Sequence, residues 1–486
     1  MIESPRLHSS FKPVKAFQSS GYQLLPFRFK RLKAERYLLT NLVGEYYILA
    51  AKDLQRLLAH QVSLSEELYC DLNAHHFVAD NGATSPLHLL AAKYRTKQAR
   101  RPNLTALHLF VVTLRCEHSC HYCQVSRASE DRTSFDMTEE TADRAIDLML
   151  ESPSLHLKVE FQGGEPLLNF PLIQYIVHRV QERKDGRQVQ FVITSNLACL
   201  TEEMLDFCLL HGILFSTSLD GPALLHNENR PRPGRDSHAK AVEGIERIRK
   251  RLGRHAVAAL MTTTQASLDQ PEAIIDEYVR LGFTEIFLRP ISPYGFAVKT
   301  ATRIGYEGTQ FLEFYQRGLA HILSLNQQGI FLRETYTTLL LRRMLTPYAD
   351  GYVDLQSPAG LGLSVLAYNY DGSIYASDEG RMLAEMEDTT FRLGHVRDSS
   401  YPELIEKVLP MLSDTMTEGT PCCSECAFQP WCGSDPVFHH RTQGDLVGHR
   451  PTSAFCHRQM GVFHHLIELL ETPSVFRTLQ SWVPSR

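Results

Sequence analysis

Three features are missing from this sequence, and each absence excludes a class of protein. No stretch of about eighteen consecutive apolar residues occurs, so no membrane-spanning helix is expected. The first six residues lack the charged and then apolar layout of a secretory signal. The formal net charge is −5, without the basic bias that proteins binding duplex nucleic acid usually show. We therefore expect a cytoplasmic protein that binds neither membrane nor nucleic acid.

The composition is otherwise that of a globular protein. Of the 486 residues, 43% are hydrophobic and 22% are charged, which is ordinary for this class. The length predicts more than one domain and a large buried core. Eleven cysteines occur, and they cluster at spacings typical of metal sites. Such clustering indicates a reducing compartment rather than a disulfide framework.

The most informative motif is a short loop with three cysteines. Cys116, Cys120 and Cys123 come directly after an apolar run at residues 107–113. Three thiolates in one loop indicate a metal centre. Iron–sulfur clusters are usually held by four cysteines, so three local ligands would leave one iron free for a ligand that is not protein. The alternative is a structural zinc loop completed by a distant His or Cys, because thiolates suit zinc as well as iron.

Two later segments carry small and polar residues at predicted strand ends. The first ends in Gly163-Gly164-Glu165-Pro166, where the absence of side chains lets backbone groups approach a ligand closely. The second, residues 215–221, ends in a polar run that contains Ser218. Glycine pairs are common at ordinary strand ends, so each segment is weak evidence alone.

Taken in order, the three segments resemble the signature of radical S-adenosylmethionine (SAM) enzymes. The resemblance implies that Cys116, Cys120 and Cys123 hold a [4Fe-4S] cluster. In this family the open iron chelates SAM through its amine and carboxylate, and one electron cleaves the sulfonium to a 5′-deoxyadenosyl radical. The chain is therefore expected to be an enzyme, a radical SAM oxidoreductase.

The resemblance also assigns cofactor-binding residues. Gly163, Gly164 and Glu165 match the turn that holds the SAM amine. Ser218 matches the serine that meets SAM, and Arg230 matches the arginine that approaches its carboxylate. Three further assignments are weaker: Tyr122 near the adenine, Asn196 facing the ribose and Ile291 flanking the adenine.

The fold class expected for the central region is α/β. From residue 107 to about 291, short apolar runs alternate with amphipathic stretches, which predicts parallel strands with crossover helices. Six such units are too few for an ordinary eight-strand barrel, so a partial (β/α)6 TIM-type barrel is expected, as in the radical SAM core. Its catalytic loops should lie at the carboxyl ends of the strands, where the cysteine loop, the glycine pair and Ser218 all fall. The expected strands are residues 107–113, 157–162, 189–194, 213–219, 255–262 and 284–288, and two expected helices are 138–150 and 201–210.

We expect three regions: 1–101, 102–305 and 306–486. The first carries no chemical motif, and its residues 37–49 read as two short strands around a turn, followed by a helix from Ala51. It would be a small N-terminal α+β module. Peptide recognition and a structural cap over the barrel are both open as its role.

The third region begins with a helical stretch at 306–325 and contains a second group of cysteines. Cys423, Cys426, Cys432 and Cys456 form a strong metal signal, and Cys422 could replace Cys423. The region resembles the cysteine-rich SPASM domain, which usually carries two auxiliary [4Fe-4S] clusters. Ser377 and Pro436 stand where two cysteines of one cluster would be expected, so only one auxiliary cluster is expected. Zinc is the competing occupant.

The remaining cysteines are expected to be structural. Cys70, Cys199 and Cys208 lie in apolar stretches that read as helical, where free cysteine behaves as a small buried hydrophobe. The histidines beside the cysteine groups are left unassigned.

Along nearly its whole length the chain resembles the radical SAM/SPASM peptide maturases of the His-Xaa-Ser system. The resemblance implies a small ribosomally made peptide as substrate, hydrogen abstraction from it, and a crosslink or an oxidised residue as product. It also implies a second radical SAM maturase of the same system and an electron donor such as flavodoxin or ferredoxin. Two alternatives stay open: formylglycine formation, as in anaerobic sulfatase maturation, and a non-catalytic metal-binding carrier. Fold alone does not decide among them.

Overall fold

The structure is a computed structural model of the whole chain. It describes residues 21–99, 104–124, 128, 131–348 and 351–483. The start of the chain and the expected boundary between residues 101 and 102 lie outside the described residues. The chain divides into two compact units, each described here by itself: Met1–Gln98 with Glu425–Pro430, and Ala99–Ser424 with Trp431–Arg486.

The smaller unit combines short antiparallel strands with helices. The expected strand pair and the helix after it are confirmed, with β3 paired to β4 and α1 beginning at Ala51. The core gathers Leu39, Leu49 and Phe77. The distant segment Glu425–Pro430 joins this unit, since Thr40 Oγ1 donates a hydrogen bond to the carbonyl of Ala427 (2.7 Å). The elements are β1 (Tyr22–Leu24), β2 (Phe27–Arg31), β3 (Arg36–Asn41), β4 (Tyr46–Ala50), α1 (Ala51–Leu58), α2 (Glu67–Ala74), β5 (Val78–Asp80) and α3 (Ser85–Gln98).

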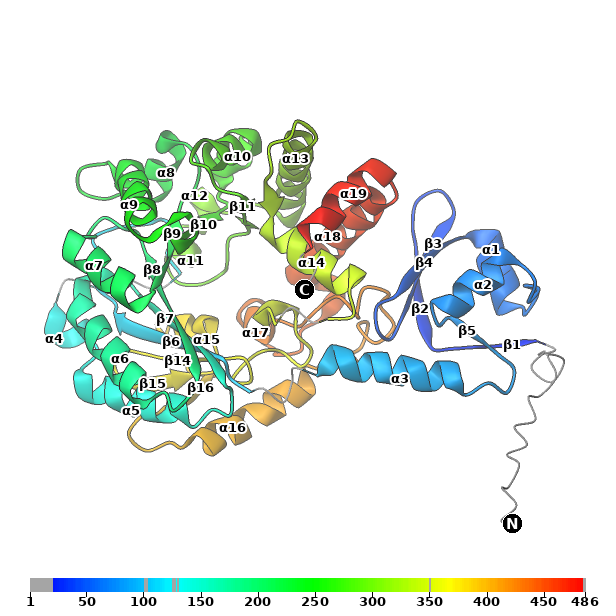
Figure 1. Ribbon diagram of the computed structural model, residues 1–486, viewed down its shortest axis with the longest axis horizontal. Helices are drawn as coiled ribbons and strands as arrows, with labels where there is room; N and C mark the ends of the chain where they lie inside the picture. The colour runs from blue at the N-terminus through cyan, green and yellow to red at the C-terminus, as the bar shows by residue number, and fades with distance from the viewer. Residues whose placement is uncertain (1–20, 100–103, 125–127, 129–130, 349–350, 484–486) are drawn as a thin grey trace, which may run out of the picture. The chain divides into compact units, whose positions relative to one another are not determined.

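The larger unit is built on a nine-stranded, mostly parallel sheet (Figure 1). Its strand order is β12-β10-β9-β8-β7-β6-β14-β15-β16. The strands are β6 (Leu107–Thr113), β7 (His156–Gly163), β8 (Gln188–Ser195), β9 (Leu214–Ser218), β10 (Val257–Thr262), β12 (Leu288–Arg289), β14 (Val365–Tyr368), β15 (Ser373–Tyr375) and β16 (Arg392–His395). Six of them, β6 to β10 and β12, are parallel and neighbour one another in chain order, as a partial barrel requires.

Two details of the sheet differ from the expectation. The predicted sixth strand is divided: β11 (Glu285–Ile286) pairs with β13 (Arg333–Glu334), and only β12 pairs with β10. The buried carboxylate of Glu334 accepts a hydrogen bond from the Leu288 N–H (3.1 Å) at this division. In addition, β14 pairs in parallel with β6, so strands from the third region extend the same sheet.

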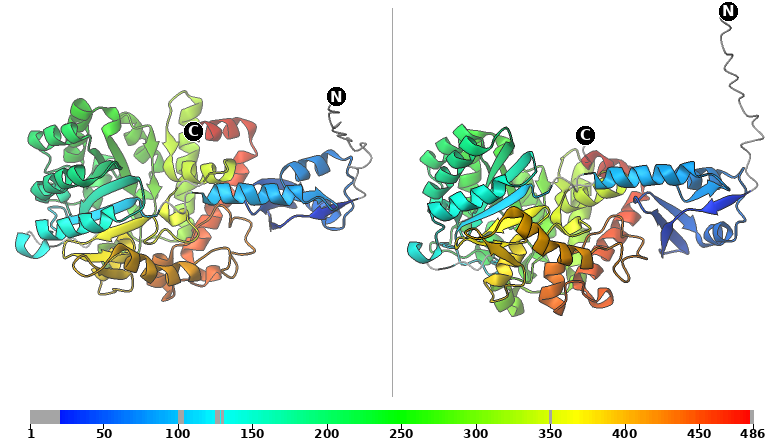
Figure 2. Two further views of the ribbon diagram at one scale, coloured as in Figure 1. Left: turned by 60° about the horizontal axis from the view of Figure 1, so that its bottom comes forward. Right: turned by 90° about the horizontal axis from the view of Figure 1, so that it is seen from below.

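Helices cover the outer face of the parallel strands, as Figures 1 and 2 show for α5, α6, α7 and α9. The two predicted helix starts are confirmed, because the Thr138 and Thr201 side chains cap α5 and α7. No helix within the described ranges is long and apolar enough to cross a bilayer. The helices are α4 (Arg132–Phe135), α5 (Glu139–Leu150), α6 (Phe170–Arg183), α7 (Glu202–His211), α8 (Ala223–Asn229), α9 (Ser237–Leu252), α10 (Pro271–Arg280), α11 (Phe296–Lys299), α12 (Ala301–Ile304), α13 (Gly308–Gln327), α14 (Thr335–Leu345), α15 (Asp378–Ala384), α16 (Tyr401–Asp414), α17 (Pro436–Gln443), α18 (Ala454–Leu470) and α19 (Pro473–Trp482).

Candidate functional site

The cysteine loop follows β6, and backbone hydrogen bonds hold it from two sides. The N–H groups of Ser119 and His121 donate to the carbonyls of Pro231 and Asn229 (2.7 and 3.0 Å). On the other side, the Cys123 carbonyl accepts from the N–H of Phe296 (2.7 Å). The segment after α8 and the segment after β12 therefore position the loop at the carboxyl end of the sheet.

The glycine pair at the end of β7 is required by the backbone of the neighbouring chain segment. A Cβ atom on Gly163 would lie 1.7 Å from the Thr113 carbonyl oxygen, and one on Gly164 would lie 2.4 Å from that of Arg115. The N–H of Gly164 donates to the Thr113 carbonyl (2.8 Å), and that of Glu165 donates to the Arg115 carbonyl (2.7 Å). The glycines thus bring the turn directly against the start of the cysteine loop, a contact that sequence reasoning had assigned to a ligand.

Glu165 is a fully buried carboxylate beside the cysteine loop. It accepts hydrogen bonds from Ser195 Oγ, the Asn196 N–H and the Leu167 N–H (2.8, 2.8 and 3.1 Å). No cation forms an ion pair with it among the described residues. Burial, with a smaller contribution from Glu117, raises its pKa to about 8. A positive group entering here would restore the ionised form.

A second buried group links the loop to β9. The Tyr122 hydroxyl donates to the Asp220 carboxylate (2.7 Å to Oδ2) and accepts from Arg230 Nη1 (2.8 Å). The guanidinium also lies 5.8 Å from the centre of the Tyr122 ring. Burial raises the pKa of the Cys120 thiol to about 12, and Arg230 opposes that rise. Arg230 therefore holds the loop tyrosine and favours the thiolate form of Cys120.

The other three predicted residues lie at the same end of the sheet. The Asn196 side-chain amide reaches the Cys116 sulfur (4.0 Å), and its oxygen accepts from the Ala198 N–H (2.9 Å). Ser218 is the last residue of β9 and is half-buried. Ile291 packs against the small apolar cluster that contains Tyr122.

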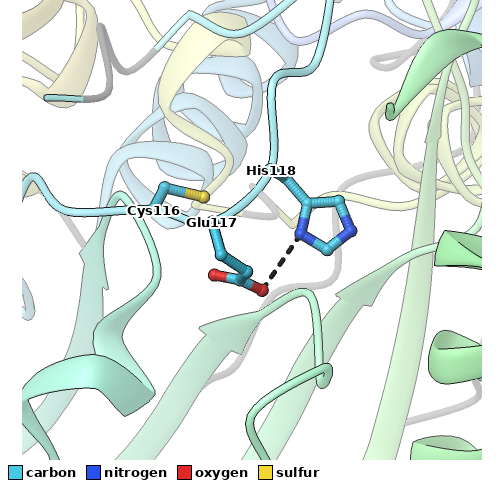
Figure 3. A group of neighbouring side chains, drawn as sticks. All are labelled: Cys116, Glu117 and His118. Atoms are coloured by element: carbon cyan, nitrogen blue, oxygen red, sulfur yellow. Dashed lines mark hydrogen bonds and ion pairs between the residues drawn. The ribbon is translucent and has the colours of Figure 1, made fainter. Parts of the chain in front are cut away.

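Figure 3 shows Cys116 with two neighbours in the loop, Glu117 and His118, that sequence reasoning left unassigned. The possible ligand atoms of Cys116, Glu117 and His118 lie within 4.8 Å of one another. Both nitrogens of His118 are engaged, one by the Glu117 carboxylate (3.0 Å) and one by Ser237 Oγ (2.9 Å). Burial raises the pKa of Glu117, but the hydrogen bonds from His118, from its own backbone N–H and from Asn196, together with the charge of His118, outweigh burial and leave the pKa lowered. Because both ring nitrogens are already engaged, His118 is better suited to a role in the loop's hydrogen-bond network than to binding a metal ion.

The spacing of the three loop sulfurs bears on which metal they suit. In the part of the chain that the structure describes, they are not gathered within 4.8 Å of one another. Thiolates sharing one zinc ion would lie about 3.8 Å apart, given a Zn–S bond of ~2.3 Å. An iron–sulfur cluster separates its cysteines by several iron and sulfide atoms. The open loop therefore fits a cluster better than a single zinc ion.

The C-terminal cysteines differ from one another in exposure. Cys422 is exposed and has a positive φ of 65°, whereas Cys423, Cys426, Cys432 and Cys456 are half-buried. Cys456 lies in the first turn of α18, and its N–H donates to the Ser453 side chain (3.2 Å). The exposure favours Cys423 over Cys422 as a ligand.

The two positions without the expected cysteines have local structural roles. Ser377 caps α15 by accepting from the Gly380 N–H (3.1 Å), and Pro436 is the first residue of α17. Both residues therefore begin helices.

The three cysteines expected to be structural differ in how far they are exposed. Cys208 is buried in α7, as predicted. Cys70 is exposed, so the expectation of burial is wrong there: its position on the short helix α2 faces away from the core. Cys199 is half-buried in the loop after β8 and not in a helix. Its pKa rises to about 12, chiefly through burial and then through Glu117 and Glu165, which places it beside the candidate site.

Sequence reasoning missed two residues that hold the site together. Asp220 binds Tyr122, and its N–H donates to Nδ1 of His226 (3.2 Å). Nε2 of His226 lies 3.1 Å from Ser237 Oγ, the hydroxyl that also contacts His118. Asp220 stands two residues after Ser218, so an ionisable group next to a predicted strand end was the available signal. His226 left none.

Comparison with known proteins finds similarity in the central region. Residues 110–277 match the model of the Radical SAM superfamily. An uncharacterized protein of Methanocaldococcus jannaschii is 34% identical over 115 residues, which are 24% of this chain and 38% of that protein. The serine-type anaerobic sulfatase-maturating enzyme of Bacteroides thetaiotaomicron is 28% identical over 144 residues, 29% of this chain and 34% of that enzyme. The matches to these two relatives thus span only about a third of their length.

Solved structures extend the similarity in fold. The structure of anSMEcpe with bound AdoMet, another abbreviation for SAM, covers 77% of this chain and 99% of its own, with a TM-score of 0.63 and 15% identity. Streptococcus suis SuiB bound to its precursor peptide SuiA covers 88% of this chain and 98% of its own, with a TM-score of 0.51 and 13% identity. At these identities the likeness concerns the fold alone.

Proposed function

Because residues 110–277 match the model of the Radical SAM superfamily, we propose that this chain reductively cleaves SAM and abstracts hydrogen from a ribosomally made peptide. The observation that carries the proposal is Glu165: a buried carboxylate, without an ion-pair partner among the described residues, beside a loop of three cysteines. A ligand with an amino group that binds at the loop would supply the missing positive charge.

The residues present fit the cofactors that the family implies. Cys116, Cys120 and Cys123 would hold the [4Fe-4S] cluster, and Glu165 would hold the SAM amine. When bound, the cluster and SAM supply the one-electron cleavage that starts the reaction. Gly163 and Gly164 would fix the turn against the loop.

The remaining predicted residues would position SAM. Tyr122 is held by Asp220 and Arg230, so its ring is fixed at the adenine side that we propose, next to Ile291. Asn196 would turn its amide between the cluster sulfur and the ribose. Ser218, at the end of β9, would contact SAM from the neighbouring strand, and Arg230 would meet its carboxylate.

We also keep Cys423, Cys426, Cys432 and Cys456 as the proposed ligands of one auxiliary [4Fe-4S] cluster in a SPASM-like region. The cysteine spacing supports this proposal. Iron and sulfide analysis of protein purified without air tests it, with about eight irons per chain expected and about four contradicting it. Zinc found in stoichiometric amount would replace the second cluster.

The proposed substrate is a small peptide of the His-Xaa-Ser type. The support is indirect: anSMEcpe and SuiB, both similar in fold, have structures with bound peptides. A second radical SAM maturase and a flavodoxin or ferredoxin as electron donor complete the proposed system. Mass spectrometry of the peptide after coexpression with this chain tests the assignment. Loss of two hydrogens would indicate a crosslink or desaturation, and an unchanged mass would favour the carrier alternative.

The chemical step is tested by forming 5′-deoxyadenosine from SAM with reduced, reconstituted protein. The Cys120→Ala variant should lose this product, because one of only three loop ligands is gone. Cys70→Ala is the matched control, since Cys70 is exposed on α2 and outside the site. Equal turnover by Cys120→Ala and the wild type would contradict the site assignment.

Formylglycine formation remains the second candidate, favoured by the similarity to the sulfatase-maturating enzyme of B. thetaiotaomicron. An aldehyde-reactive hydrazide distinguishes the two products. It should label a formylglycine-containing peptide and leave a crosslinked one unlabelled.

A further inference from the structure

A second site lies in the larger unit, beyond the end of β12. An inner cavity of about 70 Å³ opens there, lined by the chain after β12 and by parts of α15, α17 and α18. A wider cavity of about 470 Å³ shares the lining residues 290–292, Phe438 and Arg458 with it. The wider cavity is also lined by Ala297, which packs with Tyr122 of the cysteine loop. Together they extend from the neighbourhood of the candidate site to the inner cavity.

Three carboxylates line the inner cavity. Asp354, Glu379 and Asp435 come from three separate segments, and their side chains are only partly covered because they face the cavity. Burial and mutual repulsion raise the pKa of Asp435 to about 8 and that of Glu379 to about 7. Asp435 Oδ1 accepts from the Phe438 N–H (2.9 Å), which accounts for one oxygen of the set.

A tyrosine hydroxyl without a partner lies in the same lining. Tyr294 is 2% exposed, and its hydroxyl has no hydrogen-bond partner among the described residues. The field of all three carboxylates acts on this hydroxyl, with Asp435 contributing most. Leaving a buried hydroxyl without a hydrogen-bond partner is unfavourable. The orphaned group points to a ligand that brings a hydrogen-bonding atom into the cavity.

Aromatic rings form another part of the lining. Phe287 and Tyr336 are stacked, with ring centres 5.9 Å apart and an angle of 3° between the planes. Tyr352 stands edge-on to both, at 6.5 and 6.3 Å. Rings grouped in this way attract organic cations through their faces.

With all three carboxyl groups ionised, the cavity would carry one excess negative charge. Arg289 and Arg458 also line it, so three carboxylates face two guanidinium groups. Within the described part of the chain, the three carboxylates do not form a group whose ligand atoms lie within 4.8 Å of one another. They are therefore spread around the cavity and not gathered for a metal ion. A positive charge on an organic group entering the cavity would favour the ionised forms of these carboxyl groups and neutralise the excess charge of the ionised set.

We propose that this cavity binds a basic side chain, such as a lysine ammonium, of the peptide substrate. The wider cavity would receive the peptide backbone, while the carboxylates, the Tyr294 hydroxyl and the three rings surround the cationic head. The identification of the ligand as part of a substrate rests on the proposed function. The cation preference rests on the cavity alone.

The test measures binding of a short peptide to the full-length protein by calorimetry. The probe is acetyl-Gly-Gly-Lys-Gly-Gly-amide, and its matched analogue carries norleucine, which has no charge, in place of lysine. The lysine peptide should bind at least about tenfold more tightly. Glu379→Gln should weaken its binding about tenfold, and Tyr294→Phe about threefold. Glu406→Gln, on the exposed face of α16, is the charge-matched control and should bind like the wild type.

Three outcomes would overturn the cation site: equal binding of the two peptides, unchanged lysine binding by Glu379→Gln, or displacement of the lysine peptide by stoichiometric calcium. Circular dichroism identifies variants that fail to fold, and Asp435→Asn then replaces Glu379→Gln, because asparagine keeps the helix cap. Selective lysine binding by a wild-type protein that forms no 5′-deoxyadenosine would support the cation preference and overturn the proposed function. Cleavage of SAM without selective binding would overturn the cavity proposal alone.

Discussion

Glu165 and the inner cavity are two places where carboxyl groups have raised pKa values, but their surroundings differ. Glu165 is surrounded closely by three hydrogen-bond donors, and a glycine pair holds its turn against the cysteine loop. The three carboxylates of the cavity have space, aromatic rings and an unpaired hydroxyl in front of them. Close packing suits one fixed ligand group, whereas an open, ring-lined cavity accommodates flexible side chains. In the two proposals above, Glu165 would contact the cofactor and the inner cavity would contact the substrate.

The largest expected effect tests how rigid the Glu165 side is. Gly163→Ala should lower the free energy of unfolding by about 4 kcal/mol or prevent folding, because its Cβ would overlap the Thr113 carbonyl oxygen. Gly186→Ala is the control, since that glycine has space around it and a φ of 75°. It should cost only about 1 kcal/mol. Chemical denaturation measures both, and equal losses would show that the close approach is unimportant.

The cavity should make stability depend on pH. Between about pH 4.5 and 8 the folded protein keeps protons on Asp435 and Glu379 that the unfolded chain has released, so their contribution to stability falls as pH rises. In the double variant Asp435→Asn and Glu379→Gln, neither side chain can gain or release a proton in this pH range. It should resemble the wild type at pH 5 and exceed its stability by a few kcal/mol at pH 9, since a tenfold change in proton affinity corresponds to ~1.4 kcal/mol. Thermal unfolding across this range measures the difference, and a difference that shrinks as pH rises would contradict the prediction.

Removing the charge at Glu165 tests whether this residue, and not the inner cavity, is needed for cleavage of SAM. Glu165→Gln keeps a hydrogen-bonding side chain but lacks the negative charge for an amine, so formation of 5′-deoxyadenosine should fall about 100-fold. The control is Glu334→Gln: Glu334 is also buried and accepts from three groups, but it caps α14 away from the cysteine loop. Its variant should lose stability and keep the reaction. Similar turnover by both variants would contradict the role of Glu165.

The smallest effect concerns hydroxyl groups. Tyr294→Phe should leave the ligand-free protein equally stable or up to about 1 kcal/mol more stable, because its hydroxyl has no partner among the described residues. Tyr278→Phe should lose about 1 kcal/mol, since that hydroxyl donates to the Leu219 carbonyl (2.8 Å). Thermal unfolding compares the two. A clear loss for Tyr294→Phe would mean that the hydroxyl is already satisfied.

Local pattern was enough to predict the elements that carry the candidate site. Alternation of apolar runs and amphipathic stretches predicted the strands β6 to β10, and threonine caps predicted the starts of α5 and α7. Strand ends then placed the cysteine loop, the glycine pair and Ser218 at one edge. These signals work because each depends on residues close together in the chain.

Long-range pairing escaped prediction. Nothing in residues 365–368 indicates that they pair with β6, since a strand's own pattern does not name its partner. The inner cavity was missed for the same reason: Asp354, Glu379 and Asp435 are far apart in the sequence and meet only in the folded chain. The exposure of Cys70 depended on which face of α2 meets the core. Cys199 was predicted to be helical, but it lies in the loop after β8, where the charge of Glu117 acts on it.

The pairing of β6 with β14 has a consequence for biosynthesis. One edge of β6, a strand of mostly buried residues, stays open until β14 has been made about 250 residues later. At 5–20 residues per second, the ribosome needs roughly 12–50 s for that length. An open apolar edge invites pairing with other nascent chains throughout that interval. Recovery of correctly folded protein from an expression host should therefore improve with slower initiation or added chaperones.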